Sequence, residues 1–255
     1  MTESSEPPPP IPNPWVRWFV VGLPFGLLIM GALSFVFYFQ KRNAAREIQP
    51  SRYSAVMRKD VNLEEYRRYL KVLDQDIGPR TQDQPGNIEA AQSFIQSTLG
   101  FDNMGYDLER RERGKSVAFE AALPAAKSPH ELVLVCARYD GVRAESLATL
   151  FCLAHALTGT SQRNAVRFFV FDQLGVGIVQ DKASAIAVPY KDWNAKETFD
   201  SILTVFITSP GESPPSTGAG IVALPSPGAA DPAALQTLRD NQAVIEKYAN
   251  APLPK

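Results

Sequence analysis

The sequence contains few of the residues from which metal centres, nucleophilic triads and disulfide frameworks are built. Only two of its 255 residues are cysteines and only two are histidines. Cys136 and Cys152 fit no CxxC metal pattern and are too few for a disulfide framework, so we expect both to pack in the core. The net charge is −1 and no basic run is interleaved with aromatic residues, which argues against nucleic-acid binding.

The usual enzyme signatures are also missing. The sequence has no GxSxG nucleophile elbow, no GxxxxGK(S/T) phosphate loop, no GxGxxG after a strand and no HExxH helix. His155 lies on an expected helix, one turn from Cys152, and such a pair would hold a metal only if further ligands joined it. A packed, hydrogen-bonded histidine is the interpretation we favour, and we expect no cofactor.

One long apolar run is present. Residues Phe19 to Phe39 carry no charged side chain over 21 positions, and a helix of about 20 residues spans a hydrocarbon core of about 30 Å. Trp15 and Trp18 lie at one end and Tyr38 at the other, as in an aromatic belt. A cleaved signal peptide is the alternative, but the run is too long, the preceding region is acidic and no A-x-A site follows. The sequence predicts a single transmembrane helix within residues 15–40.

The residues around this span bear on its partners. Residues 1–14 combine many prolines with serine and glutamate, which predicts a disordered tail. Gly22 and Gly26 form a small-xxx-small pair, with Gly31 further along, so a neighbouring membrane helix could pack closely there. We therefore expect the lipid bilayer and a membrane-protein partner to contact this segment.

Charge around the span bears on topology. Only Arg17 precedes it, whereas a basic linker, residues 41–60, follows. The basic residues of the linker are Lys41, Arg42, Arg46, Arg52, Arg58 and Lys59. By the positive-inside rule this bias places the following domain in the cytoplasm.

Residues 61–255 contain the pattern of an α/β domain. Leu132–Cys136 and Ala165–Phe171 are short apolar runs, and between them apolar residues recur at helical spacing from Leu147 to Leu157, before Gly159. A strand, a helix and a strand of this kind predict a βαβ unit. Both strands are apolar almost throughout, which is typical of parallel strands covered on both faces. The expected fold is α/β, with a mixed, mainly parallel central sheet and helices on both faces.

Further elements follow from capping and breaking residues. We expect a helix from Leu63 with Asn62 as its N-cap, a helix Ile88–Leu99 capped by Asn87, a hairpin of Tyr106–Arg111 and Ser116–Leu123, strands Ser201–Thr208 and Gly220–Leu224, a Pro/Gly-rich loop over residues 210–230, and a last helix from Pro232 to about Tyr248.

Several strings in this domain resemble those of a known family. They are Ile77-Gly78-Pro79-Arg80, Leu99-Gly100-Phe101, the ELVLVCARYDGV strand, the LATLFCLAHAL helix and the AVRFFVFDQLG strand. In this order, over about residues 63–211, they resemble the zinc aminopeptidase family that includes glutaminyl cyclases and the transferrin-receptor ectodomain. The resemblance implies two zinc ions at the carboxyl ends of the strands, held by a His-x-Asp, a bridging Asp, a Glu-Glu pair, a further Asp and a distal His.

This chain departs from the family at nearly every ligand position. Arg138 stands at the histidine of His-x-Asp, and Asp140 is retained. The short loop that follows leaves Val142 or Arg143 near the bridging Asp. The Glu-Glu pair after Asp172 becomes Gln173-Leu174 or Leu174-Gly175, Thr208 stands where the strand-end Asp is expected, and no histidine follows His155.

The chemistry at Arg138 differs most from that of the family. A guanidinium stays protonated, has no lone pair to donate and repels a cation. It can pair with Asp140 and Asp172 as a salt-bridged plug, or it can lie at a solvated rim. A further hypothesis is that a peptide, or its amino terminus, binds here with Asp140 and Asp172 as anionic contacts.

These residues together favour a non-catalytic, membrane-anchored domain that resembles a degenerate, shortened peptidase. We expect it to act as a binding or scaffold domain, or as an accessory subunit of a membrane complex. The alternative is an active membrane-anchored metallo-hydrolase with atypical zinc ligands. The resembling enzymes usually work outside the cytoplasm, which opposes the charge bias on topology.

Overall fold

The structure is a computed structural model that describes residues 15, 29–30, 34–35, 60–113, 116–123, 130–160, 162–172, 199–212 and 220–253. The chain divides into two compact units, residues 1–49 and 50–255. Within the first unit, Trp15, Met30 and Phe35 are helical and exposed. No helix among the described residues is long and apolar enough to cross a membrane. The proline-rich tail, Gly22, Gly26, Gly31 and most of the predicted span and linker lie outside the described residues, so the predictions made for them stay predictions.

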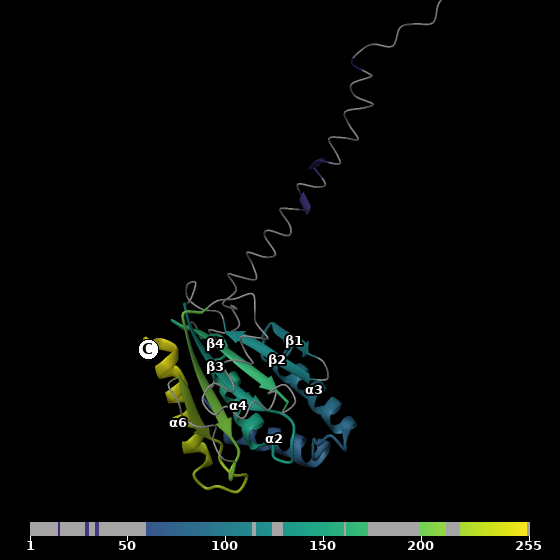
Figure 1. Cartoon of the computed structure of the whole chain (residues 1–255), viewed down its shortest axis with the longest axis vertical. Coiled ribbons are helices and arrows are strands. Elements are labelled where there is room, and N and C mark those ends of the chain that lie inside the picture. Colours follow the sequence, from purple (N-terminus) through teal and green to yellow (C-terminus); the bar gives the residue numbers. More distant parts are fainter. Residues whose placement is uncertain are drawn as a thin grey trace, which may run out of the picture. The chain divides into compact units, whose positions relative to one another are not determined.

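The second unit is built on one six-stranded sheet (Figure 1). Its strands are β1 (Leu108–Arg113), β2 (Ser116–Leu123), β3 (Glu131–Arg138), β4 (Ala165–Phe171), β5 (Ser201–Thr208) and β6 (Ile221–Pro225). The spatial order is β1-β2-β4-β3-β5-β6. β1 and β2 form an antiparallel hairpin, β2 pairs antiparallel with β4, and β4, β3, β5 and β6 run parallel. The prediction of a mixed, mainly parallel sheet is confirmed.

The helices are α2 (Leu63–Lys71), a π-helical continuation η2 (Val72–Ile77), α3 (Pro85–Leu99), α4 (Glu145–Leu157) and α6 (Ala234–Asn250). Helix α4 connects the adjacent parallel strands β3 and β4, so the predicted βαβ unit is confirmed. Asn62 caps α2 as predicted, because its Oδ1 accepts the N–H of Glu64 at 2.8 Å. Asn87 is not an N-cap. It lies inside α3, which begins at Pro85, and its amide donates to the Pro79 carbonyl at 2.8 Å.

Both faces of the sheet are buried, but the described helices cover only one. Val133, Val135 and Ala137 of β3 face a core that includes residues from α2, α3, α4 and α6. Leu132, Leu134 and Cys136 face a second, smaller apolar cluster without residues from the described helices. The expectation of helices on both faces is therefore met on one face only among the described residues.

Candidate functional site

The carboxyl ends of the parallel strands bring the predicted site residues to one edge of the sheet. Arg138 ends β3, and its register partner Phe171 ends β4, directly before Asp172. Thr208 ends β5. Because β3, β4 and β5 run in the same direction, these three strand ends meet where ligands bind in sheets of this kind.

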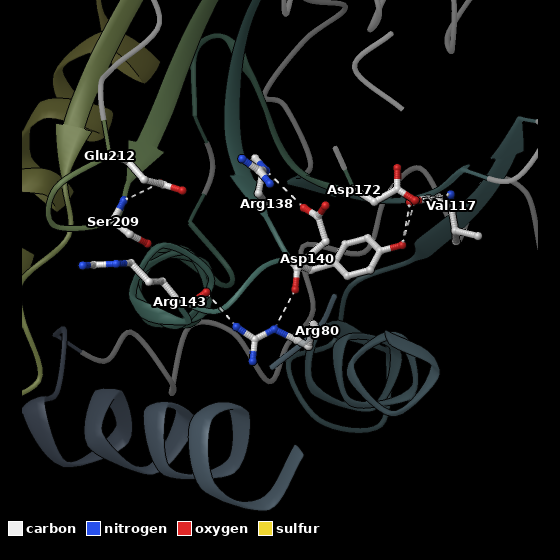
Figure 2. A network of polar contacts seen from close by, with 9 residues as sticks. Arg80, Val117, Arg138, Asp140, Arg143, Asp172, Ser209 and Glu212 are labelled. Carbon is white, nitrogen blue, oxygen red and sulfur yellow. Dashed lines mark hydrogen bonds and ion pairs between the residues drawn. The ribbon is translucent and has the colours of Figure 1, made fainter. Parts of the chain in front are cut away.

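Arg138 and Asp140 form an ion pair at this edge. The Arg138 Nε donates to the Asp140 Oδ1 over 3.1 Å (Figure 2). The two side chains are 28% and 16% exposed, so solvent screens the pair only partly. Pairing between Arg138 and Asp140, one half of the sequence-based plug hypothesis, is confirmed.

Asp172 joins a different polar group, centred on the buried Tyr139. The Tyr139 hydroxyl lies 3.2 Å from the carbonyl oxygen of Val117 and 3.4 Å from the Asp172 Oδ2, and it accepts the Gln92 Nε2 at 2.9 Å. The Val117 N–H also donates to the Asp172 carboxylate at 3.3 Å (Figure 2). Burial and the neighbouring Asp172 carboxylate raise the pKa of the Tyr139 hydroxyl, which therefore stays protonated at neutral pH.

The Arg80 side chain holds the loop between β3 and α4. Its side chain is 1% exposed. The Nε donates to the Tyr139 carbonyl at 2.8 Å and Nη2 donates to the Arg143 carbonyl at 2.7 Å (Figure 2). Burial lowers the pKa of the Arg80 guanidinium, and the carboxylates of Asp74, Asp140 and Glu145 oppose that shift. The loop that carries Asp140 is thus fixed by a cation that enters the sequence analysis only as the last residue of the Ile77-Gly78-Pro79-Arg80 string.

A second set of contacts ties the end of β5 to the start of α4. The Ser146 N–H donates to the Ser209 Oγ at 3.3 Å, and the Ser209 N–H donates to the Glu212 Oε2 at 2.9 Å. The Arg143 Nη1 donates to the Pro210 carbonyl. Figure 2 shows Arg143, Ser209 and Glu212 to the left, away from Asp172 and Val117.

The remaining predicted site residues are placed as follows. Thr208 is buried, its Oγ1 lies 3.4 Å from the Leu224 carbonyl, and its own carbonyl accepts the Ser226 Oγ at 2.5 Å. Gln173 and Leu174 lie outside the described residues. His155 is a packed, hydrogen-bonded histidine as predicted, because its Nδ1 contacts the Glu65 Oε2 at 2.9 Å. Cys136 and Cys152 are buried free thiols, as expected.

The residues at this edge do not fit the zinc centre that the resemblance implies. Zinc takes deprotonated N, S or O donors at close to 2 Å. The first ligand position is a guanidinium, which has no lone pair, and it is ion-paired with the retained Asp140 at 3.1 Å. Among the residues that the structure describes, no group of three or more His, Cys, Asp or Glu side chains is arranged to hold a metal ion.

Comparisons with known proteins found matches among solved structures only. No protein-family model matches the sequence, and the search of curated proteins found no match. A solved structure of a putative zinc-dependent exopeptidase from Bacteroides vulgatus matches with 14% identity and a TM-score of 0.44, over 59% of this chain and 62% of that chain. A glutaminyl cyclase from Fimbriiglobus ruber matches with 16% identity and a TM-score of 0.43, over 58% and 62% of the two chains.

A leucine aminopeptidase precursor from Bacteroides thetaiotaomicron matches with 10% identity and a TM-score of 0.43, over 58% of this chain and 62% of that chain. This chain therefore spans less than two thirds of the length of all three proteins. Because the TM-scores are below 0.5, the matches carry no argument. Any function has to be argued from the residues of this chain.

Proposed function

We propose that this chain is a single-pass membrane protein whose α/β domain is non-catalytic and binds a partner, as a scaffold or accessory subunit of a membrane complex. The observation that carries the non-catalytic part is the Arg138–Asp140 ion pair at the carboxyl end of β3. Arg138, a permanent cation, stands at the position where the resembled family has a histidine that binds a zinc ion. The neighbouring acid, Asp172, accepts hydrogen bonds from Tyr139 and Val117.

A binding role is supported by the way this edge is built. Arg80, Tyr139 and Arg143 hold the loops with side-chain bonds to main-chain carbonyls rather than leaving them loose. Val142, at the tip of the β3–α4 loop, is 68% exposed. A fixed loop with an exposed apolar tip loses little entropy when it docks against another protein.

The membrane part of the proposal depends on the uncharged run of residues 19–39 and on Gly22 and Gly26 within it. A helix of that length matches the thickness of a bilayer. Small residues four apart let a second helix approach closely, which would bring the domain next to a membrane-protein partner.

Site-specific photocrosslinking in intact membranes tests this proposal. A photoreactive amino acid at position 142 of the full chain probes the loop beside Arg138. The matched control is position 101, because Phe101 is also an exposed apolar residue, at 76%, but lies in the turn after α3. We expect one discrete membrane-protein adduct from position 142 and none from position 101.

A second pair of variants assigns that adduct to the site. The double substitution Arg138→Ala with Asp140→Ala removes the ion pair at the carboxyl edge and should weaken crosslinking from position 142. Its control, His130→Ala with Asp200→Ala, removes a side-chain contact of 3.4 Å at the opposite end of β3, beside the start of β5. Equal adducts from positions 142 and 101, or none from either, would contradict the proposal. Zinc-dependent hydrolysis by the purified chain would support the metallo-hydrolase alternative instead.

A further inference from the structure

Arg80 makes more contacts than an exposed residue in the turn after a helix would make. Besides the Tyr139 and Arg143 carbonyls, its Nη1 donates to the Leu73 carbonyl at 2.6 Å and to the Gly78 carbonyl at 2.9 Å. Four donor contacts from one buried guanidinium therefore reach main-chain carbonyls in two separate segments of the chain. The first segment is 73–78, at the end of η2, and the second is 139–143, the β3–α4 loop.

The π-helical turn creates the first half of this arrangement. In η2 the Gly78 N–H donates to the Leu73 carbonyl over 3.2 Å, a spacing of five residues instead of the four of an α-helix. The same carbonyl also accepts the Arg80 Nη1. Gly78 then leaves the helix with φ +80°, a left-handed conformation that favours glycine. The carbonyl groups of Leu73 and Gly78 therefore both point at Arg80.

A backbone bridge creates the second half. The Arg80 N–H donates to the Gly141 carbonyl at 2.9 Å, and the Gly141 N–H donates back to the Arg80 carbonyl at 2.8 Å. Gly141 has φ +104°, so this loop also depends on a glycine. The guanidinium and the main chain of Arg80 together hold the loop at Tyr139, Gly141 and Arg143.

The planar guanidinium suits this role better than another cation would. Its five N–H groups are fixed in one plane and can reach several carbonyls at once, whereas the ammonium of lysine has three donors at a single point. The direct partners of Arg80 are carbonyls. The carboxylates of Asp74, Asp140 and Glu145 act on its charge from nearby and favour the protonated form.

We propose that Arg80 is a positioning residue that couples segment 73–78 to loop 139–143, so that a conformational change in either segment is transmitted to the other. Segment 73–78 ends the first helical unit of the domain, and loop 139–143 carries Asp140. The coupling gives the chain a physical connection between its first helices and the carboxyl edge of the sheet. It goes beyond the proposed function, because it requires neither a partner nor a membrane.

Coupling of this kind is reciprocal, which makes it testable from both ends. Gly78→Ala strains the first segment through its backbone alone. Its φ of +80° is unfavourable for alanine, whereas the new Cβ would meet no atom nearer than 3.6 Å. Gly141→Ala strains the loop, where nothing lies within 4 Å of the new Cβ. Gly105→Ala is the matched control, because Gly105 also has positive φ, +82°, with nothing within 4 Å, in a turn remote from Arg80 in sequence.

The measurement is hydrogen exchange of the full chain in mild detergent, followed by mass spectrometry of peptides that cover 73–81 and 139–145. We expect Gly78→Ala to speed exchange about tenfold in the loop peptide, and Gly141→Ala to do the same in the helix peptide, from the cost of a left-handed alanine. Gly105→Ala should change neither peptide. In an Arg80→Lys background, which keeps the main-chain bridge to Gly141 but loses the guanidinium contacts, each glycine substitution should affect the other segment clearly less.

Two results would overturn the coupling. One is that each glycine substitution changes only its own peptide while Arg80 is intact, which would make Arg80 a local support. The other is that Gly105→Ala speeds both peptides as much as the test variants do, which would indicate global loosening. If the Arg80→Lys protein does not fold, the reciprocity measured with Arg80 intact still decides between these outcomes.

Discussion

The polar group around Tyr139 allows a stability prediction for the candidate site. Tyr139→Phe keeps the ring and its edge-to-face contact with Phe119, whose centroid lies 6.2 Å away. It removes the hydroxyl that accepts the Gln92 amide at 2.9 Å and faces the Val117 carbonyl and the Asp172 carboxylate. The perturbation therefore isolates hydrogen bonding from packing.

The magnitude follows from what loses a partner. One net hydrogen bond contributes about 1 kcal/mol, and a buried group left with fewer partners costs about 1–3 kcal/mol. Asp172 is 7% exposed and keeps the Val117 N–H, so the cost for its carboxylate is partial. We expect Tyr139→Phe to lower the free energy of unfolding by about 2 kcal/mol.

The assay is equilibrium urea unfolding of the full chain in mild detergent, followed by far-UV circular dichroism. Tyr106→Phe is the control, because its buried hydroxyl donates to the Ala154 carbonyl at 2.6 Å and contacts only the Thr158 hydroxyl besides, at 3.2 Å, which keeps its own bond to the Ala154 carbonyl at 2.9 Å. We expect a smaller loss for Tyr106→Phe, of about 1 kcal/mol. A Tyr139→Phe protein as stable as the wild type would refute the view that this group is built around the hydroxyl.

Three further predictions concern other parts of the domain. Burial raises the pKa of Tyr69 from 10.0 to about 12, so its contribution to stability is complete below pH 10 and is lost as pH rises toward 12. Between pH 10 and 12 the free energy of unfolding of the wild type, measured with urea, should fall by about 1.4 kcal/mol per pH unit more than that of Tyr69→Phe. Parallel plots of unfolding free energy against pH for the two proteins would contradict this. Asn164→Ala should cost about 1–3 kcal/mol in the same assay, because the Asn164 side chain donates to the carbonyls of residues 248 and 251 at 2.8 Å each; an unchanged midpoint would count against it. Glu120→Ala should cost about 3–5 kcal/mol, since Glu120 pairs with Arg111 at 3.0 Å and Arg167 at 2.5 Å, and a loss below 1 kcal/mol would show that these pairs are not stabilising.

Local patterns were sufficient to predict much of the fold. The apolar runs of β3 and β4 and the helical spacing between them identified the βαβ unit, because burial on both faces leaves a continuous apolar signal. Asn62 was found as an N-cap since its contact, to Glu64, is two residues away. The prediction that Asn87 is an N-cap was wrong. Its side chain donates to the Pro79 carbonyl, before the helix, and α3 begins two residues earlier, at Pro85.

The site was only partly predictable, for a different reason. The Arg138–Asp140 pair is local in sequence and is one of the two interpretations that the sequence offers for Arg138. The roles of Arg80 and Tyr139 depend on contacts between segments 59 and 33 residues apart, which no local pattern records. A charged residue directly after a helix-breaking Gly-Pro was the one available signal for Arg80, and it gave no indication of burial.

We propose that the Arg138 guanidinium keeps metal ions away from the carboxyl edge of the sheet. Elemental analysis of the full-length protein, purified in mild detergent without chelators or added metal, tests it most directly. We expect zinc far below one ion per chain. One or two zinc ions per chain, retained through dialysis, would contradict it and would indicate that the ligands lie elsewhere in the sequence.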